Sequence, residues 1–145
     1  MNLKYVSLAA TVVLVVAVLG LLVRHAIFAG RPALVALQVM AAWLMVWARL
    51  NLGARSFHAA ANPTEGGLIK TGPYRWLRHP IYTAVLLFVW AGIASHATLM
   101  NGLLAVLASV AIAVRIGAEE RLLAQRYPEY VAYAAQTKRV IPFVV

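Results

Sequence analysis

The sequence predicts an all-α fold, an integral membrane bundle of about four transmembrane helices followed by a C-terminal amphipathic helix. Two observations predict it. Hydrophobic residues make up 63% of the 145-residue chain, well above the roughly 45–50% of soluble domains. They also gather in four runs whose interiors lack Lys, Arg and Glu, each close to the length that crosses a bilayer. We therefore expect a single membrane-embedded domain over residues 1–145.

The predicted spans are residues 5–23, 33–49, 81–97 and 99–114. The first would extend roughly 28 Å as a helix, and we interpret it as a retained span because no small-residue cleavage site follows it. The second carries Trp43 and Trp47 near its basic end, where aromatic side chains anchor helices at the interface. The third and fourth are joined by a tight turn. A polar-flanked helix over residues 116–136 is expected to lie along the membrane surface.

The charge distribution predicts how this bundle is oriented. The chain has 13 basic and 4 acidic residues, a net charge of +9. With four spans, all basic residues except Arg24 and Arg31 lie on the side that holds both termini and the loop over residues 53–79. By the positive-inside rule, we expect that side to be cytoplasmic. Because these residues flank apolar spans, they indicate contact with anionic lipid headgroups and not with nucleic acid.

The reactive side chains of the sequence exclude several kinds of site. The chain has no cysteine, so disulfides, thiolate catalysis and cysteine-ligated metals are excluded. No histidine has a His or Glu partner at metal-ligand spacing, so we expect no metal site. The four acidic residues are all glutamates, and each is therefore a candidate for a specific role.

The first polar segment, residues 62–82, combines a glycine pair, prolines, arginines and aromatic rings. Gly66 and Gly67 free the backbone for close approach to a ligand. Pro80 suits the first turn of the third span and pushes His79 into an extended conformation outside it. Exposed backbone donors, an imidazole and aromatic faces would suit a purine. The alternative is an interfacial belt of aromatic and basic residues without a ligand.

The second polar segment follows the last apolar run. Arg115 and Glu119 share a helix face, whereas Glu120 points about 100° away. A carboxylate can receive a ligand ammonium group, and a guanidinium can clamp a ligand carboxylate. The alternative is an arginine that snorkels to the interface and pairs with its helix neighbour. We expect the two polar segments to meet in one site at the membrane face.

Four ordered motifs carry a resemblance to a known superfamily. Glu-Gly-Gly-x-x-x-Thr-Gly-Pro-Tyr-Arg-x-x-Arg-His-Pro-x-Tyr ends at Tyr82, and Arg-x-x-x-Glu-Glu-x-x-Leu begins at Arg115. Tyr-Pro-Glu-Tyr-x-x-Tyr and Arg-x-Ile-Pro follow. Together, over residues 62–142, the chain resembles the isoprenylcysteine carboxyl methyltransferase and phospholipid methyltransferase superfamily. One departure is Ala84, where the family often has glycine.

The resemblance implies a membrane enzyme that transfers a methyl group from S-adenosylmethionine to a lipophilic or prenylated substrate, with carboxyl O-methylation of an isoprenylcysteine-like substrate as the first choice. Arg115 and Glu119 would be the catalytic pair, and Arg115 would bind the substrate carboxylate. The residues implied to bind the cofactor are Gly66, Gly67, Leu68, Ile69, Tyr74, His79, Pro80, Ile81, Tyr82, Glu119 and Glu120.

Three alternatives stay open at this point. One is N-methylation of a phospholipid amine, for which Glu120 or His79 would serve as the base. Another is an NADPH-dependent reductase of the sterol type, against which the length of the chain argues. The third is a lipid-binding or scaffold protein without enzymatic activity. The sequence does not identify the methyl acceptor, its entry path or the oligomeric state.

Overall fold

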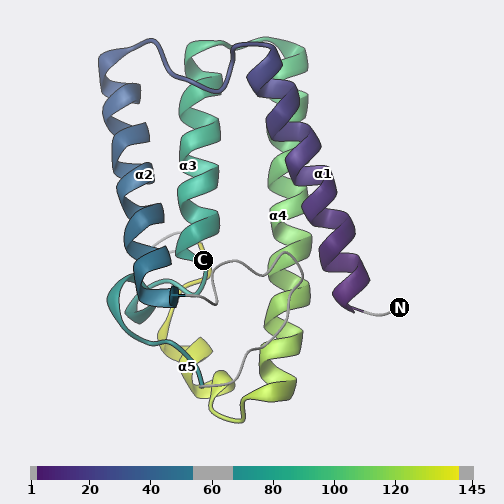
Figure 1. The fold of residues 1–145 in the computed structure, drawn as a ribbon, viewed down its shortest axis with the longest axis vertical. Helices are drawn as coiled ribbons and strands as arrows, with labels where there is room; N and C mark the ends of the chain where they lie inside the picture. The colour runs from purple at the N-terminus through teal and green to yellow at the C-terminus, as the bar shows by residue number, and fades with distance from the viewer. Residues whose placement is uncertain (1–2, 54–66, 141–145) are drawn as a thin grey trace.

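The computed structural model describes residues 3–53 and 67–140, and its elements are helical (Figure 1). They are α1 (Leu3–Val23), α2 (Pro32–Leu52), the 3-10 helix η2 (Gly72–Arg75), α3 (Pro80–Ser95), α4 (Leu99–Arg126) and α5 (Tyr130–Gln136). The described residues contain no strand, and their one isolated bridge joins Leu77 to Lys138. The all-α prediction is confirmed.

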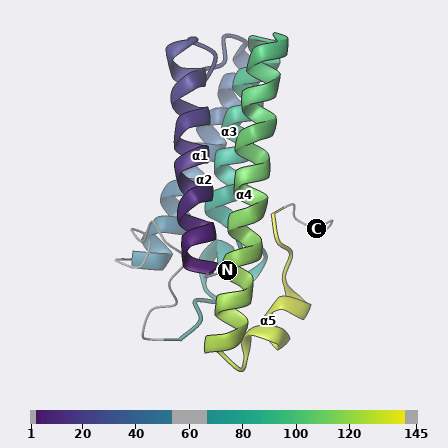
Figure 2. The ribbon, with the colours of Figure 1, turned by 90° about the vertical axis from the view of Figure 1, so that its right-hand side faces the viewer.

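The long helices form two packed pairs, with α1 against α4 and α2 against α3 (Figures 1 and 2). The α1–α2 and α3–α4 connections lie together at one end of the bundle, here called the connection end. The η2 segment and α5 lie at the opposite end, here called the polar end, where α4 extends past the other helices. All residues of the two polar segments that the structure describes are therefore gathered at one end.

Helix lengths agree with a membrane bundle. α1, α2 and α4 are each long and apolar enough to span a bilayer, and α3 is a shorter apolar helix of 16 residues. Such a helix extends about 24 Å. α3 begins where the sequence analysis placed it, because Pro80 occupies the first helical position. His79 lies just outside the helix but is not extended as expected, since its φ of −127° is combined with a ψ of 56°.

The expectation of a separate surface helix over residues 116–136 is wrong. α4 continues without a break through this region to Arg126, and only the seven-residue α5 follows. The physical reason is that Ala, Glu, Leu, Arg and Gln after Arg115 all favour helix, and a lone Gly117 is tolerated. The helix ends before Pro128, which cannot continue it. As a result, the second polar segment is carried on a rigid helix that also packs in the bundle.

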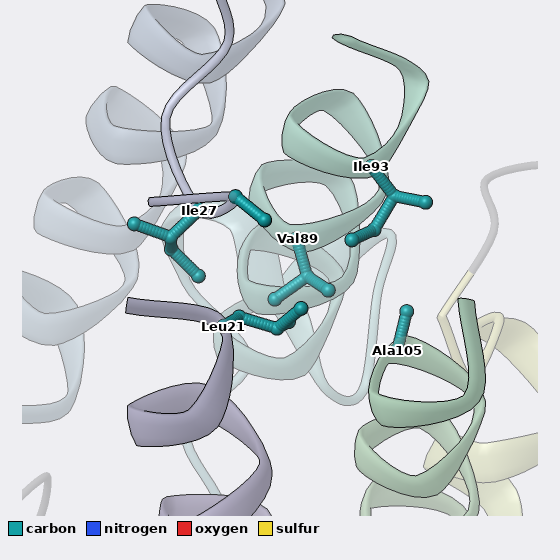
Figure 3. Packing of buried hydrophobic residues seen from close by; sticks show 6 residues of the cluster. Leu21, Ile27, Val89, Ile93 and Ala105 are labelled. Atoms are coloured by element: carbon teal, nitrogen blue, oxygen red, sulfur yellow. The ribbon is translucent and has the colours of Figure 1, made fainter. Parts of the chain in front are cut away.

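The hydrophobic core lies near the connection end (Figure 3). Its buried residues come from α1, α3, α4 and the α1–α2 connection, and they are Leu21, Ala26, Ile27, Val89, Ile93 and Ala105. Gly92 of α3 allows the connection to approach closely, because a Cβ there would lie 2.5 Å from the Ile27 carbonyl oxygen. This close contact fixes the connection against α3.

Gln38 is a buried polar residue of α2 that joins three segments near this core. Its Nε2 donates to the carbonyl oxygens of Ile27 (2.7 Å) and Phe88 (2.9 Å), and its Oε1 accepts from the Ala29 amide (2.9 Å). The side chain is 6% exposed. Since a buried amide is costly unless hydrogen-bonded, this set of bonds stabilises one arrangement of α2, α3 and the connection.

We predict that Gln38→Leu destabilises the protein, because it leaves two carbonyls and one amide of the connection and α3 without this partner. The loss should be about 1–3 kcal/mol, seen as a lower midpoint of thermal unfolding in detergent. Gln125→Leu is the matched control, because Gln125 is exposed on α4. Equal midpoints for the two variants would show that the Gln38 bonds do not stabilise the bundle.

Candidate active site

The two polar segments meet where the first turn of α3 contacts the middle of α4. His79 and Tyr82 come from the start of α3, and Arg115, Glu119 and Glu120 come from α4. Tyr82 hydrogen-bonds both Arg115 and Glu119, and His79 lies 3.4 Å from Glu120. The expectation that these segments form one polar cluster is confirmed by these contacts.

Arg115, Tyr82 and Glu119 form a closed set of hydrogen bonds. Arg115 Nε donates to the Tyr82 hydroxyl (2.6 Å), Arg115 Nη2 donates to Glu119 Oε1 (2.9 Å), and the Tyr82 hydroxyl donates to Glu119 Oε1. The guanidinium also lies 5.6 Å from the Tyr82 ring centroid. Arg115 is only 6% exposed. An isolated pair four residues apart contributes little, but here Tyr82 links the pair to a second helix.

One carboxylate oxygen of Glu119 accepts the hydrogen bonds from Arg115 and Tyr82, and the other does not take part in them. Oε2 lies 3.8 Å from His79 Nδ1, and the glutamate side chain is 20% exposed. Within residues 3–53 and 67–140, no donor is within hydrogen-bond distance of Oε2. The carboxylate is therefore held in position by Oε1 while Oε2 can accept a hydrogen bond from a ligand.

Glu120 has different partners from Glu119. Its Oε1 accepts from Arg78 Nε at 3.0 Å, and its Oε2 pairs with Arg139 Nη2 at 3.0 Å. Arg78 Nη1 also donates to the Thr137 carbonyl oxygen (2.9 Å). Glu120 thus joins the segment before α3 and the segment after α5 to α4.

Residues 137–140, here called the tail segment, pair with the segment before α3. The Lys138 amide donates to the Trp76 carbonyl (2.9 Å), the Arg78 amide to the Lys138 carbonyl (2.7 Å), and the His79 amide to the Arg139 carbonyl (3.0 Å). α5 also packs there, since the Tyr133 hydroxyl donates to the carbonyl of Tyr74 in η2 (2.6 Å). Burial raises the pKa of Tyr133 to about 12, so this donor stays protonated at neutral pH.

Two buried polar atoms near Glu120 have no hydrogen-bond partner among the described residues. They are His79 Nε2 and the Tyr130 hydroxyl. His79 is 6% exposed, and its 3.4 Å approach to Glu120 is an ion-pair distance without hydrogen-bond geometry. Both groups interact with the Glu120 carboxylate, so these atoms belong to the polar network around Glu120.

The remaining predicted site residues lie around this cluster or outside it. Pro80 and Ile81 are in the first turn of α3, and Tyr74 is buried in η2. Gly67, Leu68 and Ile69 are half-buried in the coil before η2 and make none of the contacts above. Gly66 lies outside the described residues. Ala84 is buried in α3, 1% exposed.

Sequence reasoning did not identify Arg78, Arg139 and Thr83 as residues that hold the site together. Thr83 donates to the Val140 carbonyl (2.7 Å), and both arginines pair with Glu120. The available signal was that both arginines lie within the motifs quoted above, next to His79 and before Ile141-Pro142. Pairing between them and Glu120 depends on tertiary contacts, which the motifs alone do not specify.

Comparison with known proteins gives two matches. A family model described as phospholipid methyltransferase matches residues 32–130, which includes the whole cluster except its tail segment. Over 76 residues the chain is 32% identical to the "Cobalt-zinc-cadmium resistance protein CzcN" of Cupriavidus metallidurans. That alignment covers 52% of this chain and only 35% of the relative's length. No solved structure matches the chain.

We predict that Glu120→Gln releases the tail segment, because the arginines on either side lose their shared carboxylate. Trypsin cleavage after Lys138 or Arg139 should become about tenfold faster, which corresponds to losing about 1.4 kcal/mol of charge-assisted hydrogen bonding. The measurement is intact mass against time of digestion in detergent.

The matched control is Glu129→Gln, which makes the same change at an exposed position at the start of α5. Cleavage that is equally fast in both variants would show that Glu120 does not hold the tail segment.

Proposed function

The chain belongs to the phospholipid methyltransferase family, and we propose that it transfers a methyl group from S-adenosylmethionine to a lipophilic acceptor in the membrane. Membership of this family, together with the apolar helices, supports the proposal that the chain is an integral membrane methyltransferase. The observation that carries the finer proposal is the geometry of Glu119. Arg115 and Tyr82 fix one of its oxygens, and no donor in the described part of the chain is within hydrogen-bond distance of the other.

The residues of the cluster fit the polar groups of this cofactor. A carboxylate oxygen that is fixed in place and lacks a donor suits the ammonium of an amino acid, and Glu119 Oε2 meets both conditions among the described residues. His79 Nε2 lies 3.4 Å from Glu120 without hydrogen-bond geometry and has no other partner among the described residues, and we propose that it meets a second polar atom of the cofactor. We propose that Tyr74 and residues 79–82 line the pocket, with backbone contacts from residues 66–69.

Glu120 is proposed to act beside the cofactor by holding His79 and the tail segment. Its carboxylate is already shared between Arg78 and Arg139, so it has less capacity than Glu119 to accept from a ligand. Its ion pairs keep the tail segment against the N-terminus of α3, where they would exclude water from the reacting groups.

When bound, the cofactor would supply an electrophilic methyl group on a sulfonium. The acceptor lone pair would bond to the methyl carbon as the carbon–sulfur bond breaks, and S-adenosylhomocysteine would leave. We propose a carboxylate acceptor, because a carboxylate is ionised at neutral pH and needs no general base. Arg115 would orient it, and Tyr82 and Glu119 keep the guanidinium in one position. Correct orientation of two reactants can supply about 7–11 kcal/mol of the barrier reduction, so the chain needs no nucleophile of its own.

An amine acceptor is the second candidate, and the description of the matching family favours it. An amine must lose a proton on methylation, so a base is required. His79 is the better placed of the two proposed bases, because its Nε2 is unpartnered among the described residues while Glu120 is shared between two arginines.

We further propose that the polar end faces the cytoplasm. The structure gathers the described parts of both polar segments at that end, and among the Lys and Arg residues that the structure describes, the connection end carries Arg24 and Arg31. Positive residues are retained on the cytoplasmic side of membrane proteins. This orientation would expose the cluster to a soluble cofactor.

We predict that Glu119→Gln weakens binding of S-adenosylhomocysteine about 10- to 100-fold, the effect of losing a charge-assisted hydrogen bond. Isothermal titration of the purified protein in detergent measures this, with Glu129→Gln as control. Unchanged affinity in Glu119→Gln would remove Glu119 from the cofactor site.

Titration with NADPH separates the methyltransferase from the reductase, since only a reductase would bind it.

We predict that isotope-labelled methyl transfer into a membrane lipid extract gives a product whose label is released as methanol by mild alkali. Methyl esters hydrolyse under these conditions, whereas methylated amines do not. Label that stays with the lipid after alkali would favour the amine acceptor. If the acceptor is a carboxylate, Arg115→Lys should also lose most activity, because lysine cannot make the bidentate contact.

A further inference from the structure

A row of aromatic rings runs along the outer face of α2 to the polar end. The Trp43 and Trp47 ring centroids are 5.0 Å apart, and those of Trp47 and Trp76 are 6.2 Å apart. The Arg75 guanidinium lies 5.1 Å from the Trp76 ring centroid and ends the row. Trp43 is 63% exposed and Trp76 is 52% exposed. We call these four residues the tryptophan row.

Arg75 differs from the other arginines described above. Arg78, Arg115 and Arg139 all bind Glu119 or Glu120. Arg75 is exposed and makes no hydrogen bond or ion pair with any residue in the described part of the chain, only the contact with the Trp76 ring. A guanidinium that is held on a ring keeps its planar set of donors for an anion, and this set matches phosphate oxygens.

The row is built by local structure and is not a chance gathering of interfacial side chains. Gly72, at φ +57°, allows the η2 turn to lie against α2, because a Cβ there would be 2.5 Å from the Asn51 side chain. Thr71 Oγ1 donates to Asn51 Oδ1 (3.2 Å), and Asn51 Nδ2 donates to the Trp47 carbonyl (2.9 Å). These contacts keep Trp76 beside Trp47.

We propose that the tryptophan row binds a membrane lipid with an anionic phosphate headgroup. Arg75 would bind the phosphate, and the three indole rings would lie along the part of an acyl chain that is closest to the headgroup. Charge complementarity supports an anionic occupant, because Arg75 is the uncompensated charge of the row and the chain has a net charge of +9. Position supports a lipid, because Trp43 and Trp47 belong to a helix apolar enough to span a bilayer.

This site goes beyond the proposed methyl transfer and does not depend on it. None of its four residues contributes to the cluster around Glu119, and the test uses no cofactor. Failure of one proposal therefore leaves the other standing.

The test measures quenching of tryptophan fluorescence by brominated lipids. The parent is Trp90→Phe, because Trp90 lies on α3, outside the row, and its ring donates a hydrogen bond to Ser109 Oγ. The emission that remains then comes from the row. The full chain is reconstituted in phosphatidylcholine vesicles with equal fractions of either brominated phosphatidylglycerol or brominated phosphatidylcholine.

We expect phosphatidylglycerol to bind about fivefold more strongly than phosphatidylcholine. This is the gain in affinity that one basic residue near an anionic membrane surface contributes. Arg75→Gln should abolish this preference. The control is Arg121→Gln, which removes one exposed charge from α4 and should leave the preference unchanged. Added salt should weaken the preference in the parent, which tests the role of charge without any change at Arg75.

Three results would overturn the proposal. Equal quenching by the two lipids in the parent would show that the row has no headgroup preference. A preference that survives Arg75→Gln would exclude Arg75 as the phosphate ligand. An equal loss in Arg121→Gln would show that the net surface charge attracts the lipid and that no specific site exists.

Discussion

The cost of burying the Arg115 guanidinium in a largely apolar bundle is the constraint on which the polar end depends. A charge at such a position must be neutralised and hydrogen-bonded, or it destabilises the fold. Glu119 supplies the opposite charge from the same helix, and Tyr82 supplies a hydrogen bond from α3. Because the three groups satisfy one another, α3 and α4 are fixed relative to each other at this level. The same contacts also fix the orientation of the groups that would meet a cofactor and an acceptor.

The neighbouring glutamates show how two consecutive positions on a helix can have separate roles. Successive residues point about 100° apart, so Glu119 contacts α3 while Glu120 contacts the arginines of the adjoining segments. Glu119 retains an oxygen that no described donor uses, whereas both oxygens of Glu120 are engaged. The proposed division between ligand binding and structural support follows from this difference in partners and not from the identity of the residues.

The parts of the structure that follow from local pattern could be predicted from the sequence. The apolar runs gave the helices of the bundle, and Pro80 gave the start of α3. The ordered motifs led to the expectation that Tyr82 and Glu119 meet. The continuity of α4 was missed because the change from apolar to polar residues after Val114 resembles a helix boundary, although the backbone has no reason to end there. Gln38 and the partners of Glu120 were missed because they depend on tertiary contacts.

Because α4 is unbroken, the same helix crosses the bilayer and carries the residues of the proposed site. An α-helix is stiff along its axis, and α4 runs 28 residues from the α3–α4 turn through Arg115 and Glu119 to the polar end. A bilayer thicker or thinner than its apolar surface is accommodated by tilting such a helix. Because Tyr82 and Glu119 fix α3 and α4 to each other at the polar end, tilting α4 would strain this contact. Bilayer thickness is thereby linked to the geometry of the proposed site.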